Sequence, residues 1–185
     1  MYRTCLLLYI LSISFWATGQ SYKEWNNKVD KLFREGKYID AISIAINARD
    51  AAQKESGENS GDYAVSLNYL ALIYKEIGNY SAAEPLFKQA LSIGKKIWGE
   101  GDDYATILGN LGLLYKTMGN YVAAEPLYEK VLAIRDQGLG KKDPKYALSL
   151  NYLAELYQSM GKYSAAEQLL KQALHPMQVI GLITT

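Results

Sequence analysis

The sequence predicts an all-α protein, a right-handed α-solenoid of antiparallel helix pairs. Three observations predict this fold: apolar residues at helical spacing, a unit of ~42 residues that recurs along the chain, and only four prolines. Apolar residues make up 49% of the 185 residues, which is enough for a continuous core. Because one helix pair cannot bury its apolar face alone, the copies must stack.

The first segment, residues 1–19, is expected to be a signal peptide. Arg3 supplies a positive start, Cys5 to Trp16 is an apolar run, and Ala17-Thr18-Gly19 offers small residues to a signal peptidase. The run is shorter than the ~20 residues of a membrane-spanning helix, although an uncleaved anchor is the alternative. Cleavage near Gly19–Gln20 would leave an exported chain, periplasmic or extracellular, with no stable membrane span.

The next element, residues 20–57, is expected to be a degenerate first repeat, and three fuller repeats follow at 58–99, 100–141 and 142–175. The stretches 62–74, 103–115 and 145–157 align without internal gaps. A turn glycine ends the first helix of every copy: Gly36, Gly78, Gly119 and Gly161. Their spacings are 42 (78 − 36), 41 (119 − 78) and 42 (161 − 119) residues.

Each repeat is expected to contain two helices joined by a tight turn. In the repeat at 58–99, the first helix places these residues on one face: Leu67, Leu70, Ala71 and Tyr74. Its second helix does the same with Ala83, Phe87, Ala90 and Leu91. Gly78-Asn79 separates the two helices, because glycine adopts the left-handed conformation that a helix C-cap needs. Pro85 and Pro126 are expected to bend the second helices near their starts.

Small and aromatic residues recur at matching positions, which indicates close packing of the helices. The small residues are Ala71, Gly112 and Ala154 in the first helices, and Ala83, Ala124 and Ala166 in the second. Ten of the 16 tyrosines occupy three repeated positions: Tyr63, Tyr104, Tyr146; Tyr74, Tyr115, Tyr157; Tyr38, Tyr80, Tyr121 and Tyr163. We expect these tyrosines to pack in the core rather than to form a binding surface.

This pattern resembles the tetratricopeptide repeat. The ~42-residue period exceeds the usual 34, and together with Tyr-Ala-x-Ser-Leu-Asn-Tyr-Leu-Ala it is similar to the longer subtype of kinesin light chains and many exported bacterial proteins. The resemblance covers about residues 22 to 174. It departs from the pattern at Lys28, where the family has an apolar residue, so the first copy is either a capping unit or a less stable end.

The resemblance implies a non-catalytic scaffold that binds a partner peptide or domain.

The stretch His175-Pro176 is predicted to end the last helix early and leave an irregular apolar tail at 176–185. The chain is then either a truncated relative of a longer protein or a short form whose tail folds back, and the missing polar cap favours truncation. The alternative function is therefore the regulatory or sensor module of a multidomain protein, such as repeats joined to a caspase-like protease.

No catalytic, cofactor-binding or metal site is predicted. His175 and Cys5 are the only histidine and cysteine, so a histidine-based triad or a thiolate zinc site is excluded. Asp102-Asp103 and Glu100 are expected to be solvated loop charges, and Gly138-Leu-Gly140 lacks the context of a phosphate-binding loop. The 20 basic and 19 acidic residues form no basic stripe, which argues against nucleic-acid binding.

The expected functional surface is the groove lined by the first helices. Seven non-core residues are candidates for it: Asn68, Tyr69, Lys75, Asn110, Lys116, Asn151 and Tyr152. Asparagines could hold the backbone of an extended peptide, and the lysines could meet its acidic side chains or its C-terminus. The alternative is that the asparagines tie neighbouring helices together and the lysines are only solvated.

Overall fold

A computed structural model of the chain describes residues 21–179. Within this part of the chain the backbone forms eight helices and no strand: α2 (Tyr22–Arg34), α3 (Tyr38–Ser56), α4 (Gly61–Glu76), α5 (Tyr80–Trp98), α6 (Asp102–Thr117), α7 (Tyr121–Gly138), α8 (Pro144–Ser159) and α9 (Tyr163–Val179). The all-α prediction is confirmed. The predicted signal peptide at 1–19 and the last residues of the predicted tail lie outside the described residues.

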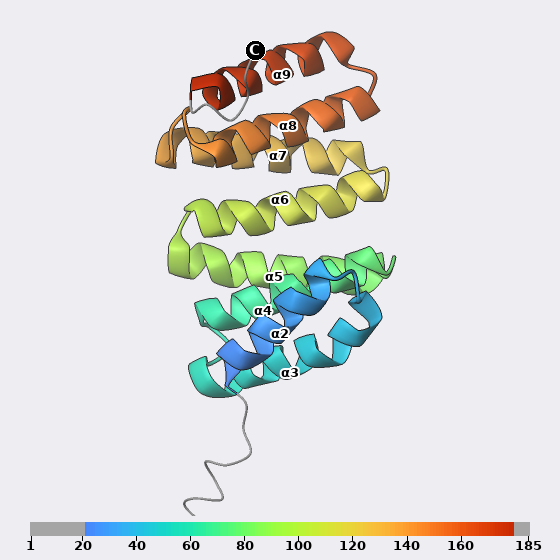
Figure 1. The fold of residues 1–185 in the computed structure, drawn as a ribbon, viewed down its shortest axis with the longest axis vertical. Helices are drawn as coiled ribbons and strands as arrows, with labels where there is room; N and C mark the ends of the chain where they lie inside the picture. Colours follow the sequence, from blue (N-terminus) through green and yellow to red (C-terminus); the bar gives the residue numbers. More distant parts are fainter. Residues whose placement is uncertain (1–20, 180–185) are drawn as a thin grey trace, which may run out of the picture.

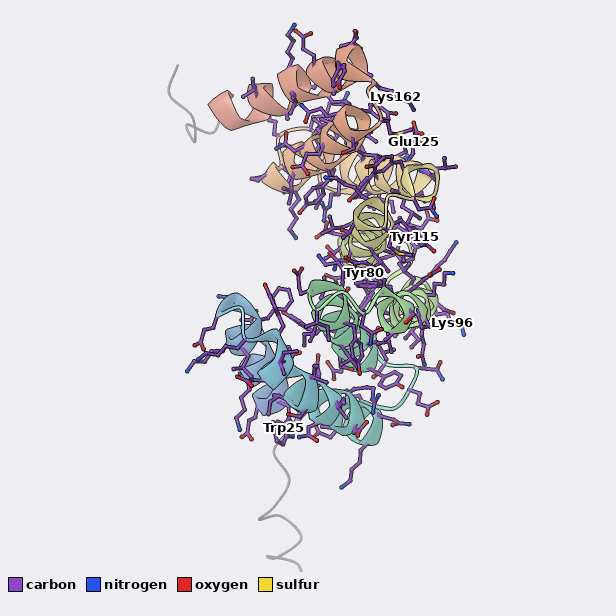
Figure 2. The ribbon with its side chains drawn as sticks, turned by 90° about the vertical axis from the view of Figure 1, so that its right-hand side faces the viewer. Trp25, Tyr80, Lys96, Tyr115, Glu125 and Lys162 are labelled. Atoms are coloured by element: carbon purple, nitrogen blue, oxygen red, sulfur yellow. The ribbon has the colours of Figure 1, made fainter. Side chains whose placement is uncertain are left out.

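The helices pack as neighbouring antiparallel pairs that stack along the long axis of the molecule, from α2–α3 to α8–α9 (Figure 1). First helices also contact the first helix of the preceding pair, as α4 does with α2 and α6 with α4. The first helices therefore lie closest together on the inner side of the curved array seen in Figure 2. We call the side formed by α2, α4, α6 and α8 the inner face.

The turn within each pair is built from a glycine and the residue that follows it. Gly78 has φ +79°, and its N–H donates to Lys75 O at 3.0 Å while that of Asn79 donates to Tyr74 O at 2.8 Å. These two hydrogen bonds close α4 around a residue in the left-handed conformation, which only glycine adopts without strain. The Asn79 side chain then accepts from the N–H of Ala82 at 3.3 Å and caps α5. One dipeptide thus ends a helix and begins the next.

Close approach of the paired helices depends on the predicted small residues. A Cβ atom on Gly112 of α6 would lie 3.0 Å from the Tyr128 ring of α7. The equivalent residues one repeat earlier, Ala71 and Phe87, are buried in one core cluster, so the larger of the two rings accompanies the smaller residue. Nine of the ten repeated tyrosines pack against the core, as expected, whereas Tyr163 at the start of α9 is 71% exposed.

Proline interrupts none of the second helices in the described chain. Pro85 and Pro126 are each the sixth residue of a continuous helix, where the lost hydrogen bond concerns an exposed first turn. The predicted end of the last helix at 175 is corrected to Val179, because the backbone stays helical through Pro176. A proline removes one backbone bond, which bends a helix without forcing the next residues out of helical angles.

Among the described residues, no helix has the length and apolar character that crossing a membrane would require.

Candidate peptide-binding pocket

The inner face holds a pocket of about 280 Å³ between α4 and α6. Each of these two helices contributes one wall, and the end of α5 contributes the indole ring of Trp98. The lining residues are Val65, Asn68, Tyr69, Leu72, Trp98, Asp103, Thr106, Ile107 and Asn110. The pocket is therefore an apolar hollow with polar groups at a few defined positions, which is the usual composition of a ligand site.

Trp98 can occupy this place because two glycines leave room for its ring. A Cβ on Gly94 of α5 would lie 2.8 Å from the Trp98 ring, and one on Gly61 of α4 would lie 3.1 Å from it. Gly94 is buried, so its missing side chain is not replaced by solvent. The indole packs on the surfaces of both glycines and closes one end of the pocket.

In the next layer, between α6 and α8, two charged residues occupy the equivalent space. Counting 41 residues along the chain, the positions of Gly61 and Gly94 are taken by Asp102 and Arg135. Arg135 is only 5% exposed, and its Nε donates to Asp102 Oδ1 at 2.9 Å. Its other nitrogens donate to Ser149 Oγ at 3.0 Å and to Thr106 Oγ1 at 3.2 Å. The layer between α6 and α8 is thus closed where the layer between α4 and α6 is open.

Asp102 is not the solvated loop charge that the sequence predicted. It begins α6, and only 19% of its side chain is exposed. Burial alone would raise its pKa, but hydrogen bonds from Lys145 and Arg135 outweigh burial and hold the pKa of Asp102 below its usual value. Sequence reasoning missed this because the two partners lie 33 and 43 residues away.

Two of the predicted asparagines meet at the pocket. Asn110 Nδ2 donates to Asn68 Oδ1 at 2.9 Å, across 42 residues of sequence. Asn68 is buried, so this bond satisfies a polar group that would otherwise be costly. Within the described chain, Asn68 Nδ2 and Asn110 Oδ1 make no hydrogen bond, so the pair offers a donor and an acceptor at the pocket wall.

The predicted lysines lie away from the pocket and are paired. Lys75 Nζ lies 2.7 Å from Glu76, and Lys116 Nζ lies 2.6 Å from Glu155. Neither lysine lines the pocket. The expectation that they would meet an acidic ligand therefore has less support than the sequence suggested, because both charges are already balanced inside the chain.

The remaining predicted residues divide between the two layers. Tyr69 lines the pocket, and burial first, then the nearby Asp30 carboxylate, raises its pKa. Tyr152 instead stacks on Tyr128, with ring centroids 5.9 Å apart, in the closed layer. Asn151 is half-buried and does not line the pocket. The structure thus brings Asn68, Tyr69 and Asn110 together and leaves the other four candidates apart.

The pocket residues that sequence reasoning missed include its only charged group. Asp103 lies in the first turn of α6, is exposed, and takes part in none of the ion pairs or hydrogen bonds found in the described chain. Trp98 and Ile107 were also missed. A signal was present, because aligning the repeats sets Gly94 against Arg135 and Trp98 against Leu139, and such exchanges mark a layer built differently from its neighbour.

No group of three or more His, Cys, Asp or Glu side chains arranged to hold a metal ion occurs in residues 21–174, whose side chains are described.

A family model described as tetratricopeptide repeat matches residues 25–96 and 103–175. Among solved structures, BtubC (BKLC) from P. vanneervenii has a TM-score of 0.78 at 23% identity, over 89% of this chain and 66% of that one. A Podosopora anserina protein with nearly identical TPR-like repeats, named for the kinesin light chain, has a TM-score of 0.74 at 21% identity, over 96% and 86% of the two chains. MamA has a TM-score of 0.64 at 19% identity, over 93% and 87%. No curated protein matches the sequence. At these identities the solved structures establish the fold alone.

Proposed function

Since the chain belongs to the tetratricopeptide-repeat family, whose repeats are generally non-catalytic, we propose that it is a scaffold that holds a peptide segment of a partner protein. The observation that carries this proposal is the pocket beside Trp98 on the inner face. Its volume of about 280 Å³ suits one large apolar side chain better than a whole drug-sized ligand. The segment would place that side chain against Trp98 and Ile107.

The polar groups of the pocket define what surrounds this anchor. The Asn68–Asn110 pair offers a donor and an acceptor, which match the C=O and N–H of an extended backbone. Among the described residues the Asp103 carboxylate has no ion-pair partner, whereas Lys75 pairs with Glu76 and Lys116 with Glu155. The partner segment we propose therefore carries a large apolar residue next to a lysine or an arginine.

Selection from a phage-displayed random peptide library on the purified chain tests this proposal. We expect enriched peptides to share an apolar residue beside a basic one, and to be lost when Ile107→Asp places a charge in the pocket. Asp103→Asn should lower the affinity for the tightest-binding peptide about fivefold and reduce the salt dependence of that affinity, as expected for one partly exposed charge pair.

A matched control is Asp40→Asn. Asp40 also lies in the first turn of its helix and is exposed, but it belongs to α3, away from the pocket. It carries the same helix-dipole contribution and should leave peptide affinity unchanged. Equal effects of the two substitutions, or enrichment of acidic peptides, would show that Asp103 does not recognise the partner.

Export is the second part of the proposal, and it is motivated by the composition of residues 1–19. Expression of the full chain in a bacterium, followed by intact mass measurement of the periplasmic and secreted fractions, tests it. We expect a mature chain that begins at Gln20. A cytoplasmic protein that retains residue 1 would contradict export.

A further inference from the structure

The inner face stays apolar beyond the pocket, in the layer between α6 and α8. Leu148 of α8 is 40% exposed, and Leu139, which follows α7, is 38% exposed. Thr106, 42 residues before Leu148 (148 − 106), lines the pocket, and so does Trp98, 41 residues before Leu139 (139 − 98). Because the buried Arg135 closes this layer, the two leucines form a shallow apolar surface rather than a second pocket. We call it the leucine surface.

The leucine surface lies within the array, between two first helices (Figure 1). Two ion pairs join α8 to α6: Lys145 with Asp102, and Glu155 with Lys116. Thr106 occupies the place of Leu148 in α6, has a first helix on both sides, and is exposed as well. The exposure of this position therefore does not depend on which helix follows.

A glycine in the middle of α6 belongs to the same layer. Gly109 is half-buried and is equivalent to Asn68, which lines the pocket one layer earlier. Glycine in a helix interior is unfavourable relative to alanine. Packing does not require it here, because outside α6 only Val131 lies within 4 Å of an added Cβ, at 3.8 Å, which is an ordinary contact. The α6 backbone is therefore open to the close approach of a ligand.

Aromatic rings lie in both layers of the inner face. Tyr69 and Trp98 line the pocket, and the half-buried Tyr152 lies in the next layer. Polyproline II helices bind to aromatic-lined surfaces and lose little conformational entropy when they do so. This backbone makes no internal hydrogen bonds, so its C=O and N–H groups are free to meet the Asn68–Asn110 pair. In the interior of an α-helix these groups are already bonded to each other.

The spacing of the first helices limits the spacing of the side chains that a partner can place on them. Neighbouring helices lie about 8–10 Å apart. Three residues of a polyproline II helix advance about 9 Å and return to the same face. A β-strand returns to the same face after two residues, about 7 Å, or after four, about 13 Å. The polyproline II repeat therefore matches the step from one layer to the next.

We propose that the partner segment binds as a polyproline II helix that crosses α6, with one apolar side chain in the Trp98 pocket and a second, three residues away, on the leucine surface. Between these two side chains the segment passes close to the backbone of Gly109. This inference rests on the proposed function of the pocket and adds the conformation and the register of the bound segment.

Fluorescence polarisation with synthetic peptides and the parent chain tests the register. Each peptide contains a leucine beside a lysine, and a second leucine two, three or four residues from the first, on the side away from the lysine. The peptide with spacing three should bind about fivefold more tightly than one without the second leucine, as for one partly buried apolar side chain. Two prolines between the leucines should raise this affinity and two glycines should lower it, because proline presets the bound backbone.

Two alanine variants separate binding from stability. Gly109→Ala should raise the urea midpoint, because alanine is the better helix residue, and yet lower the affinity for the spacing-three peptide. The matched control is Ser92→Ala on α5, where Ser92 is exposed on a second helix and Ala133 is its equivalent in α7. This control should raise the urea midpoint and leave the affinity unchanged. Equal affinities of Gly109→Ala and the parent chain would show that the segment does not approach α6 closely.

The other outcomes distinguish this inference from the function on which it rests. Equal affinities at the three spacings, or tighter binding with glycines than with prolines, would overturn the inference and leave the pocket as a site for one apolar side chain. Failure of every peptide to bind would overturn both. Leu148→Asp should remove the preference for spacing three, and a preference that persists would place the second side chain away from the leucine surface.

Discussion

Asn68 and Asn110 are joined across two repeats by a hydrogen bond of 2.9 Å, and both residues line the Trp98 pocket between α4 and α6. Asn68 is buried and depends on Asn110 for a partner, so the pair has a structural role between α4 and α6. The same pair supplies the polar groups at the pocket wall. The two interpretations of the asparagines, as ties and as peptide contacts, are therefore compatible at this position.

Asn110→Ala should lower the free energy of unfolding by about 1–3 kcal/mol, because it leaves the buried Asn68 oxygen without its donor. Urea denaturation followed by circular dichroism measures this loss. Asn151→Ala in the closed layer is the matched control, since Asn151 is half-buried and makes no side-chain hydrogen bond among those found in the described chain. If Asn151→Ala lowers the free energy of unfolding as much as Asn110→Ala does, the Asn68–Asn110 hydrogen bond has no particular role in stability.

Arg135→Ala should be the most destabilising single change in the closed layer, at about 3 kcal/mol, because it leaves the half-buried Asp102 with one cation and opens a cavity. Lys145→Ala removes the other partner of Asp102, but this lysine is 58% exposed and should cost less than about 1 kcal/mol. The two urea midpoints compared with the parent measure the difference. Similar losses for both variants would contradict the buried role of Arg135.

Gly94→Ala should displace Trp98, because the added Cβ would lie 2.8 Å from the ring. We expect a shift of the tryptophan emission and a weaker apolar anchor site in the peptide assay, with the helical content kept. Gly138→Ala is the matched control: no atom lies within 4 Å of its added Cβ. This substitution should stabilise the chain by about 0.5 kcal/mol and leave the emission unchanged. An unchanged spectrum for Gly94→Ala would show that Trp98 does not rest on this glycine.

Stability should fall at both extremes of pH. The pKa of Asp102 is lowered in the folded chain, so its contribution is complete above the unfolded value of about 3.9 and is lost as pH falls through the folded pKa. Tyr157 has its pKa raised to about 12, so its contribution is complete below the unfolded value of about 10 and is lost as pH rises toward 12.

Urea midpoints measured across pH, with tyrosinate absorbance recorded in parallel, check both arms. Tyr157→Phe should make the decline between pH 10 and 12 shallower, while the acid arm stays as in the parent. Burial also raises the pKa of Tyr22, Tyr115 and Tyr128, and these three groups contribute to the remaining slope in both chains. An identical alkaline decline with and without the hydroxyl would contradict the raised pKa of Tyr157.

The fold could be predicted from the sequence because the signals that define it are local. Gly78 with Asn79, Ala71 against Phe87, and the repeated tyrosines each report on a turn or a pair within one repeat. Alignment of the copies then places these pairs in register without any knowledge of distant contacts.

The pocket could be predicted only in part, because it depends on differences between layers. Asn68, Tyr69 and Asn110 lie on the helix face where sequence reasoning placed them. Trp98 enters the site from the end of α5, and its position follows from the missing side chain at Gly94. The two lysines failed as pocket residues for different reasons. Lys75 pairs with Glu76, its neighbour in α4. Lys116 pairs with Glu155, one repeat away, and that pairing follows from three-dimensional stacking and is not visible in one helix.

The neighbour-to-neighbour stacking of the helix pairs has a mechanical consequence. In an array whose repeats contact only adjacent repeats, stretching or bending is distributed over the interfaces between neighbouring repeats. The pocket spans the joint between α4 and α6, with Val65 on one side and Ile107 on the other. Bending at this joint changes the distance between the two walls. A force applied to the ends of the array would therefore change the affinity of the pocket for an apolar side chain. A bound side chain would in turn make the α4–α6 interface stiffer.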